Sequence, residues 1–141
     1  MSGRRARVAR LAELAAESEE RAVARLQQAA HRVAAVDRRR TSALQGASRL
    51  AGPDVSLALR AHLAGAGARH LLALADEKGE LVVEVDSRRT ELDEARTRVR
   101  SLVRLVERID RADDLRRRRA QAAELQDLVA IRAVRASKER R

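Results

Sequence analysis

The side chains that could carry out chemistry in this 141-residue chain are three histidines and several pairs of adjacent acidic residues. His31, His62 and His70 are not spaced four apart, and none falls in the H-E-x-x-H pattern of a helical zinc site. Acid pairs such as Asp76-Glu77 are expected on exposed helix faces, where nothing tunes them for acid–base catalysis. The chain has no Cys, no phosphate-binding loop and no nucleophile elbow. The sequence therefore predicts neither an enzyme nor a cofactor, metal or small-molecule substrate site.

The composition favours helices over a compact globular core. The chain holds 29 Ala, 29 Arg and one Pro, and it has no Phe, Tyr or Trp. Ala, Leu, Arg and Glu are strong helix formers, whereas strands and large cores depend on β-branched and aromatic residues. No apolar run approaches 18 residues, and the first residues do not resemble a secretory signal. We therefore expect a helical protein of the cytoplasm.

The few helix-breaking residues place two long helices. Residues 4–50 contain only Gly46 as a breaker, and they predict the first helix. Gly52-Pro53, followed by Asp54, predicts a turn over 51–54 and the start of a second helix. Gly65 and Gly67 predict a kinked segment over 55–68, and the long second helix is expected over 69–137.

The fold class predicted from these elements is all-α, an antiparallel coiled-coil hairpin in which the second helix is the longer. The whole chain, 1–141, is expected to be one elongated domain. Apolar residues at alternating spacings of four and three predict the contact face of the second helix, with Arg88 as its one charged member. The nine positions are Leu81, Val85, Arg88, Leu92, Ala95, Val99, Leu102, Val106 and Ile109.

A contact face is also predicted in the first helix, with a four-residue slip after Ala22. It begins with Val8, Leu11, Ala15, Ser18 and Ala22 and continues with Leu26, Ala29, Val33, Val36, Arg40, Leu44 and Ala47. The second helix outlasts the first, so residues from about 110 to 141 are expected to lack a partner helix within the monomer.

The net charge of +10 is unevenly distributed along the chain. Residues 1–53 and 98–141 are both strongly basic, and residues 54–97 carry a small excess of acids. An antiparallel hairpin brings the two basic segments together, which predicts a basic terminal end and a mildly acidic end near the turn. A basic end suits either phosphates or an acidic protein surface. The run of arginines from Arg116 to Arg119 spreads around the helix, and no aromatic side chain can stack on bases, so protein docking is favoured over nucleic acid.

The last third of the chain resembles the carboxy-terminal signature of the FliJ family, small coiled-coil components of the flagellar type III export apparatus. The resemblance rests on Leu102-x-Arg104-Leu105-x-Glu107-Arg108, followed nineteen residues later by Asp127 and then by Ala130 and Arg132. Chain length and the order of a first helix, an early break and a longer second helix also match. Leu128 differs from the Glu that usually follows the Asp in that family.

The resemblance implies an adaptor that docks one end in the export ATPase hexamer, contacts the export-gate membrane protein and hands on export chaperones. It further implies a monomer at the cytoplasmic face of the inner membrane, peripheral to the membrane through its partners, at the flagellar base. Two alternatives stay open: a nucleic-acid-associated coiled coil and a self-associating structural coiled coil. The residues expected to bind the partner are Arg4, Arg5, Arg7, Arg104, Arg108, Arg116, Arg117, Arg118, Arg119 and Asp127.

Overall fold

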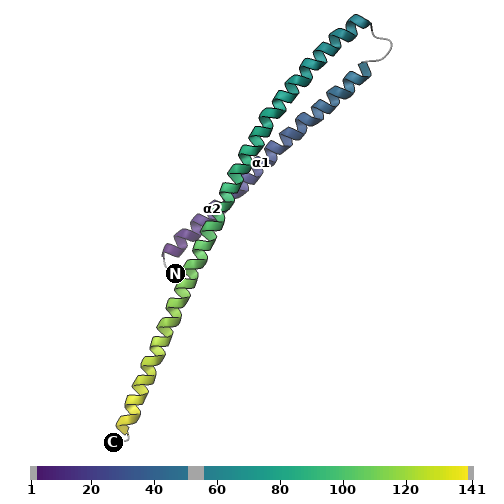
Figure 1. The fold of residues 1–141 in the computed structure, drawn as a ribbon. Helices are drawn as coiled ribbons and strands as arrows, with labels where there is room; N and C mark the ends of the chain where they lie inside the picture. Colours follow the sequence, from purple (N-terminus) through teal and green to yellow (C-terminus); the bar gives the residue numbers. More distant parts are fainter. Residues whose placement is uncertain (1–2, 51–55, 140–141) are drawn as a thin grey trace. The chain divides into compact units, whose positions relative to one another are not determined.

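The computed structural model describes residues 3–50 and 56–139, and these form two α-helices (Figure 1). Helix α1 spans Gly3–Leu50 and α2 spans Leu57–Glu139, with 48 and 83 residues. The predicted class, an all-α hairpin with a longer second helix, is confirmed. Contacts divide the chain into two units, which we call the hairpin unit (residues 15–97) and the terminal unit (residues 1–14 and 98–141).

Helix α2 begins at Leu57, directly after Ser56. The hydroxyl Oγ of Ser56 accepts a hydrogen bond of 3.3 Å from the backbone N–H of Leu59, and the Ser56 carbonyl accepts the first helical bond, of 2.9 Å, from Arg60. This is the geometry of an N-cap, in which a short polar side chain satisfies a free amide of the first turn. The predicted turn at Gly52-Pro53 lies outside the described residues, and the helix starts at Leu57.

Residues 57–68 belong to α2, where the sequence suggested a kinked segment over 55–68 ahead of a helix from 69. One continuous helix covers Leu57–Glu139. The described glycines all have negative φ, so Gly65, Gly67 and Gly79 lie within the helix without a break. Each glycine lowers helix propensity by about 1 kcal/mol relative to Ala, which is a cost that the surrounding Ala and Leu residues offset.

The core of the hairpin unit is narrow and contains small residues. In Figure 1 its two helices lie side by side, α1 in blue and α2 in teal to green. The buried residues of α1 here, Ala22, Ala29 and Val36, are seven apart, as expected for one heptad position. Those of α2 are Leu74, Leu92 and Ala95, and Ala22 packs in one cluster with Leu92 and Ala95. Because alanine buries little apolar area, this interface gains little hydrophobic free energy per residue.

The contact face of α2 is the one that the sequence predicted. Leu92 and Ala95 are buried, and the other seven predicted positions between Leu81 and Ile109 are all half-buried. The contact face of α1 differs from the prediction, because Leu11 and Ser18 are exposed and Ala12 and Glu19 are half-buried in their place. The alternation of four and three from Val8 to Val36 therefore needs no slip. Nearer the turn, Arg40, Leu44 and Ala47 are likewise exposed, where the sequence had predicted contact positions.

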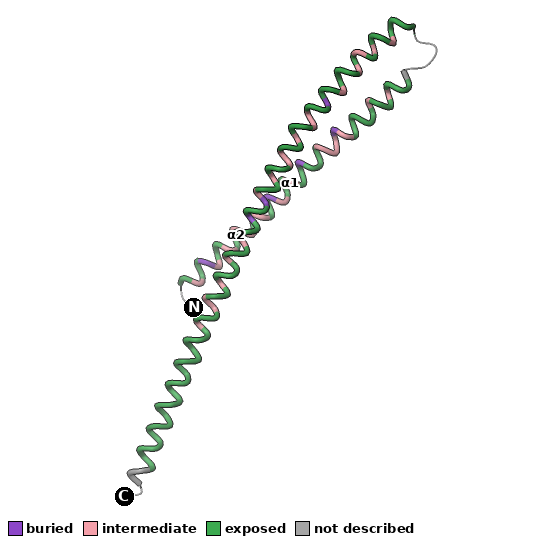
Figure 2. Tube along the Cα trace, in the orientation of Figure 1, coloured by how far each residue is buried: buried purple, intermediate pink, exposed green. Residues whose placement is uncertain are grey.

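In the terminal unit, burial fades along α2. Val8 is the buried residue of α1 in this unit, and the half-buried positions of α2 end at Asp113. Every residue from 114 to 136 is exposed, which Figure 2 shows as an unbroken green stretch. We call residues 114–136 the terminal segment. The predicted lack of a partner helix for this part of the chain is confirmed for the described side chains.

The narrow core predicts that a single large side chain carries much of the stability of the hairpin unit. Leu74 is 1 % exposed and its neighbour Leu72 is 66 % exposed. We expect Leu74→Ala to lower the free energy of unfolding by about 2–4 kcal/mol, because it removes buried methyl groups and leaves a cavity. The measurement is urea unfolding followed by circular dichroism at 222 nm. Leu72→Ala is the matched control and should change stability by less than about 0.5 kcal/mol; equal effects would contradict the observed packing.

Candidate functional site

The histidines and acid pairs that could perform chemistry do not come together in a catalytic or metal-binding arrangement in the part of the chain that the structure describes. His31, His62 and His70 are all exposed. Within the described residues, no three His, Asp or Glu side chains gather in a way that would hold a metal ion. Several acids of the adjacent pairs instead form ion pairs with arginine: Glu77 with Arg39 at 2.9 Å and Asp114 with Arg117 at 2.6 Å.

The main polar feature of the hairpin unit is a ladder of ion pairs between the two helices. On one edge, three arginines of α1 that are seven residues apart face three glutamates of α2 that are also seven apart. The pairs are Arg25–Glu91 at 3.9 Å, Arg32–Glu84 at 2.6 Å and Arg39–Glu77 at 2.9 Å. Equal spacing on both helices means that one antiparallel alignment forms all three pairs at once. We call this set the charge ladder.

The opposite edge carries ion pairs with the reverse polarity. There, acids of α1 meet bases of α2: Glu19 pairs with Arg96 at 3.4 Å, and Asp37 with Lys78 at 2.7 Å. Sliding one helix by a turn would separate these pairs and those of the charge ladder together. Exposed ion pairs contribute about 0–1 kcal/mol each to stability, so their main effect here is to select the alignment.

Arg88 joins the charge ladder to the contact face of α2. It is half-buried, and its guanidinium donates hydrogen bonds of 2.9 and 3.0 Å to the carboxylate of Glu91. A second contact, of 3.7 Å, reaches Glu84. The hydrogen bonds and the charge of Glu91 raise the pKa of Arg88. Glu84 and Glu91 therefore each pair with one arginine of α1 and with Arg88 of α2. These two carboxylates neutralise Arg88, which explains how a charged residue occupies the apolar contact face.

In the terminal unit, one ion pair ties the start of α1 to α2. Arg5 hydrogen-bonds to both carboxylate oxygens of Asp110, with 3.2 Å between Nη2 and Oδ2. A guanidinium and a carboxylate that meet through two bonds form one of the stronger kinds of surface pair. The hydrogen bond from Arg5, together with its positive charge, lowers the pKa of Asp110. One predicted partner-binding residue, Arg5, is thus used within the fold.

The other predicted partner-binding residues all lie in the terminal unit, and they are exposed. Near the start of α1, Arg7 donates a hydrogen bond of 3.2 Å to the carbonyl of Gly3. In the arginine run, Arg116 pairs with Asp113 at 3.4 Å and Arg117 pairs with Asp114. Among the described side chains, no acid pairs with the remaining arginines, and no base pairs with Asp127. These arginines are Arg4, Arg104, Arg108, Arg118 and Arg119.

The expected acidic character near the turn is wrong for the described residues, because eight of the nine acids of residues 54–97 lie further along α2. Those described begin at Asp76 and end at Glu94, and three of them, Glu77, Glu84 and Glu91, pair with arginines of α1. Closer to the turn, residues 38–49 and 56–71 hold six arginines and no acid. The hairpin unit is therefore basic near its turn and acidic on α2 along its middle.

Sequence reasoning also missed the charge ladder, although its signal is present. Arginines at 25, 32 and 39 and glutamates at 77, 84 and 91 repeat at the heptad interval. Their pairing depends on the alignment of the two helices, which the sequence did not define.

Comparisons with known proteins gave no relative for this chain. No family model matches it, and no match was found among curated proteins or among solved structures. No described helix is long and apolar enough to cross a membrane.

The charge ladder predicts that swapping the two charges of one pair preserves stability, whereas changing one charge does not. Arg39→Glu and Glu77→Arg should each lower the free energy of unfolding, because each places like charges against each other. The double variant should recover about 0.5–1 kcal/mol of that loss in a double-mutant cycle. Arg40→Glu, next to Arg39 but without a described acidic partner, is the control and should show no coupling to Glu77→Arg. A coupling energy near zero for the Arg39 and Glu77 pair would contradict the ladder.

The ion pair of Asp110 predicts a pH-dependent contribution to stability. The pKa of Asp110 is lower in the folded protein than the usual value of about 3.9 for an unfolded aspartate. Folding therefore favours the charged form, so the stabilisation is complete above about pH 4 and is lost as pH falls through the lowered pKa. In urea unfolding, Asp110→Asn should be less stable than the unchanged protein at pH 7, and this difference should shrink as the pH falls below about 4. Asp127→Asn is the control, for which no difference is expected at either end of the pH range. A difference for Asp110→Asn that does not change with pH would refute this role.

Proposed function

We propose that this protein is a non-enzymatic adaptor of the flagellar type III export apparatus, a helical hairpin whose terminal segment docks into the export ATPase ring. The observation that carries the proposal is the terminal segment itself, a helix of which every residue is exposed. Its six arginines outnumber three acids. A helix without a partner, with one dominant charge, is suited to insertion into an acidic protein surface.

The apolar residues of the terminal segment add a second reason to expect a protein partner. Leu115, Ala122, Leu125 and Val129 follow spacings of seven, three and four, which places them along one face of the helix. The three larger ones are at least half exposed. An apolar face flanked by arginines can pack against protein, whereas nucleic acid would use the charges alone.

The resemblance in residues 102–132 to the FliJ family gives the proposal its partners. If the protein acts as members of that family do, the hairpin docks in the ATPase hexamer in the way that a central stalk occupies a rotary ATPase ring. It also links the ring to the export gate and to export chaperones. The protein acts in the cytoplasm, at the inner face of the membrane, and reaches the membrane through its partners. The role of the arginines is electrostatic docking, because they carry no catalytic arrangement.

The test uses full-length protein and the export ATPase of the same organism. Immobilised protein should capture the ATPase and raise its turnover at about 50 and 150 mM salt. Arg118→Glu combined with Arg119→Glu should weaken capture at least about ten-fold, since both charges would then repel an acidic ring. The control is Arg40→Glu combined with Arg69→Glu, which changes the net charge equally but lies in the hairpin unit.

Two outcomes would overturn the proposal. One is the absence of capture by the unchanged protein at both salt concentrations. The other is an equal loss of capture in the two double variants. Binding to duplex DNA that persists at about 200 mM salt would assign the terminal segment to nucleic acid instead, since non-specific phosphate contacts weaken by orders of magnitude there.

A further inference from the structure

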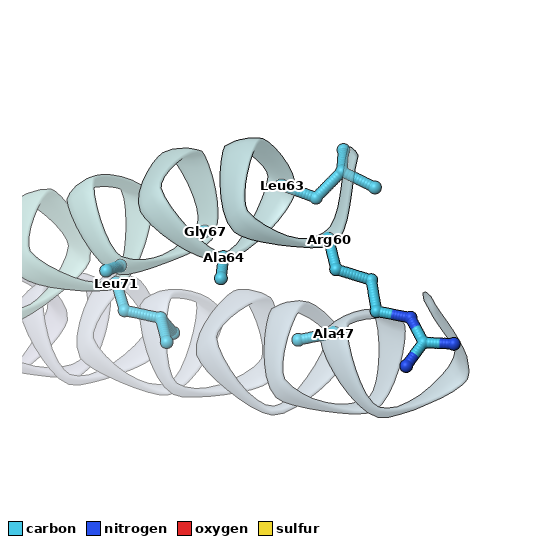
Figure 3. A pocket seen from close by; sticks show the side chains of 7 residues that line it. Ala47, Arg60, Leu63, Ala64, Gly67 and Leu71 are labelled. Carbon is cyan, nitrogen blue, oxygen red and sulfur yellow. The ribbon is translucent and has the colours of Figure 1, made fainter. Parts of the chain in front are cut away.

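The hairpin unit contains a groove between its helices near the turn, in a part of the molecule that the proposed function does not use. Two adjoining cavities, of about 380 and 880 Å³, lie between residues 35–47 of α1 and residues 60–71 of α2. They share Ala47, Leu63, Gly67 and Leu71 (Figure 3). We call this the turn-proximal groove.

The groove exists because small residues face each other across the two helices. Ala43, Gly46 and Ala47 on α1 oppose Ala64 and Gly67 on α2, and their side chains do not fill the space between the helix backbones. Figure 3 shows Ala64 directed toward α1, with Ala47 on the facing stretch of α1 and Leu63 and Leu71 along the same stretch of α2. Small side chains also let a third helix approach closely, because helix separation depends on the side chains at the contact.

Every charged group that lines the groove, within the described residues, is basic. Arg38 and Arg39 border the larger cavity together with His70, and Arg60 borders the smaller one. Arg39 is held by Glu77, whereas no described acidic side chain pairs with Arg38. An apolar floor with a basic border fits an amphipathic helix that carries acids beside its apolar face.

We propose that the turn-proximal groove binds an acidic amphipathic helix of another protein and forms a local three-helix bundle with it. The groove follows α1 for about 12 residues, which at about 1.5 Å per residue accommodates roughly three helical turns. The helix contributes apolar residues to the floor and carboxylates to Arg38 and its basic neighbours.

A second copy of this chain is a poor occupant. Its own acidic stretch, from Asp76 to Glu94, already supplies Glu77, Glu84 and Glu91 to the charge ladder. The net charge of +10 also repels another copy. The acids that complement the groove must therefore come from a different protein.

The probe for this proposal is a synthetic 14-residue amphipathic peptide with a leucine stripe, glutamates on the other positions and one Trp. The protein has no aromatic residue, so peptide Trp emission reports binding without background. We expect full-length protein to shift this emission to shorter wavelength and to bind the peptide at least about ten-fold more tightly than a version with Lys in place of Glu.

Gly67→Leu locates the binding site. A Cβ atom at Gly67 meets no atom within 4 Å, so the larger side chain can enter the groove without disturbing the hairpin. It should weaken peptide binding at least about ten-fold. Gly79→Leu is the matched control, because a Cβ at Gly79 is equally unobstructed and this residue does not line the groove. Arg38→Glu should weaken binding of the acidic peptide and strengthen binding of the Lys peptide.

Three results would overturn the proposal: no binding of the acidic peptide, equal binding of the two peptides, or equal effects of Gly67→Leu and Gly79→Leu. A vesicle arm separates the other class of anionic partner. Binding to vesicles containing phosphatidylserine that is lost in Gly67→Leu, with no peptide binding, would assign the groove to a lipid surface.

Discussion

The structure depends on a network of charges that spans the contact between its two helices. Arg25 and Arg32 of α1 meet Glu91 and Glu84 of α2, and Arg88 lies between the two glutamates on the contact face. A core of alanine and a few larger residues attracts the helices but distinguishes poorly between alignments, because successive heptads look alike. The ladder pairs repeat every heptad, so a shift of one heptad would re-form two of the three, but it would separate Glu19 from Arg96 and Asp37 from Lys78. The charged side chains of both edges together therefore favour the one alignment that the apolar residues only permit.

That selection has consequences at both ends of the chain. In the hairpin unit, it places Ala43 and Ala47 opposite Gly67, so the interface loses side-chain volume near the turn and the groove results. In the terminal unit, Arg5 and Asp110 hold the start of α1 against α2, and α2 continues alone beyond Asp113. The two candidate binding surfaces are therefore both regions where pairing between the helices is incomplete, one through small side chains and one through unequal helix length.

Much of the fold was predictable, because the contact face of α2 repeats apolar residues from Leu81 to Ile109 at heptad spacing. The start of α2 was not, because the glycines at 65 and 67 suggested a helix from residue 69, whereas the helix begins at Leu57 with the hydroxyl of Ser56 as its cap. The face of α1 was misassigned because Glu19 serves as a contact residue only through its pairing with Arg96 on the other helix. The groove and the charge ladder could not be predicted for the same reason. Each is made of residues from both helices, and their proximity follows from the alignment of the helices, which no single segment of sequence specifies.

The alignment itself can be measured directly, because the chain has no native Cys to interfere. Because Arg32 and Glu84 meet through long side chains, cysteines placed at these two positions should be joined within one molecule by a short-spacer bismaleimide reagent, detected by mass spectrometry of the monomer. Cysteines at Arg32 and Glu91, one heptad out of alignment and about 10 Å further along the helix, should not. Efficient cross-linking of the second pair, or cross-links found only between two molecules, would contradict a hairpin whose alignment is set by the charge ladder.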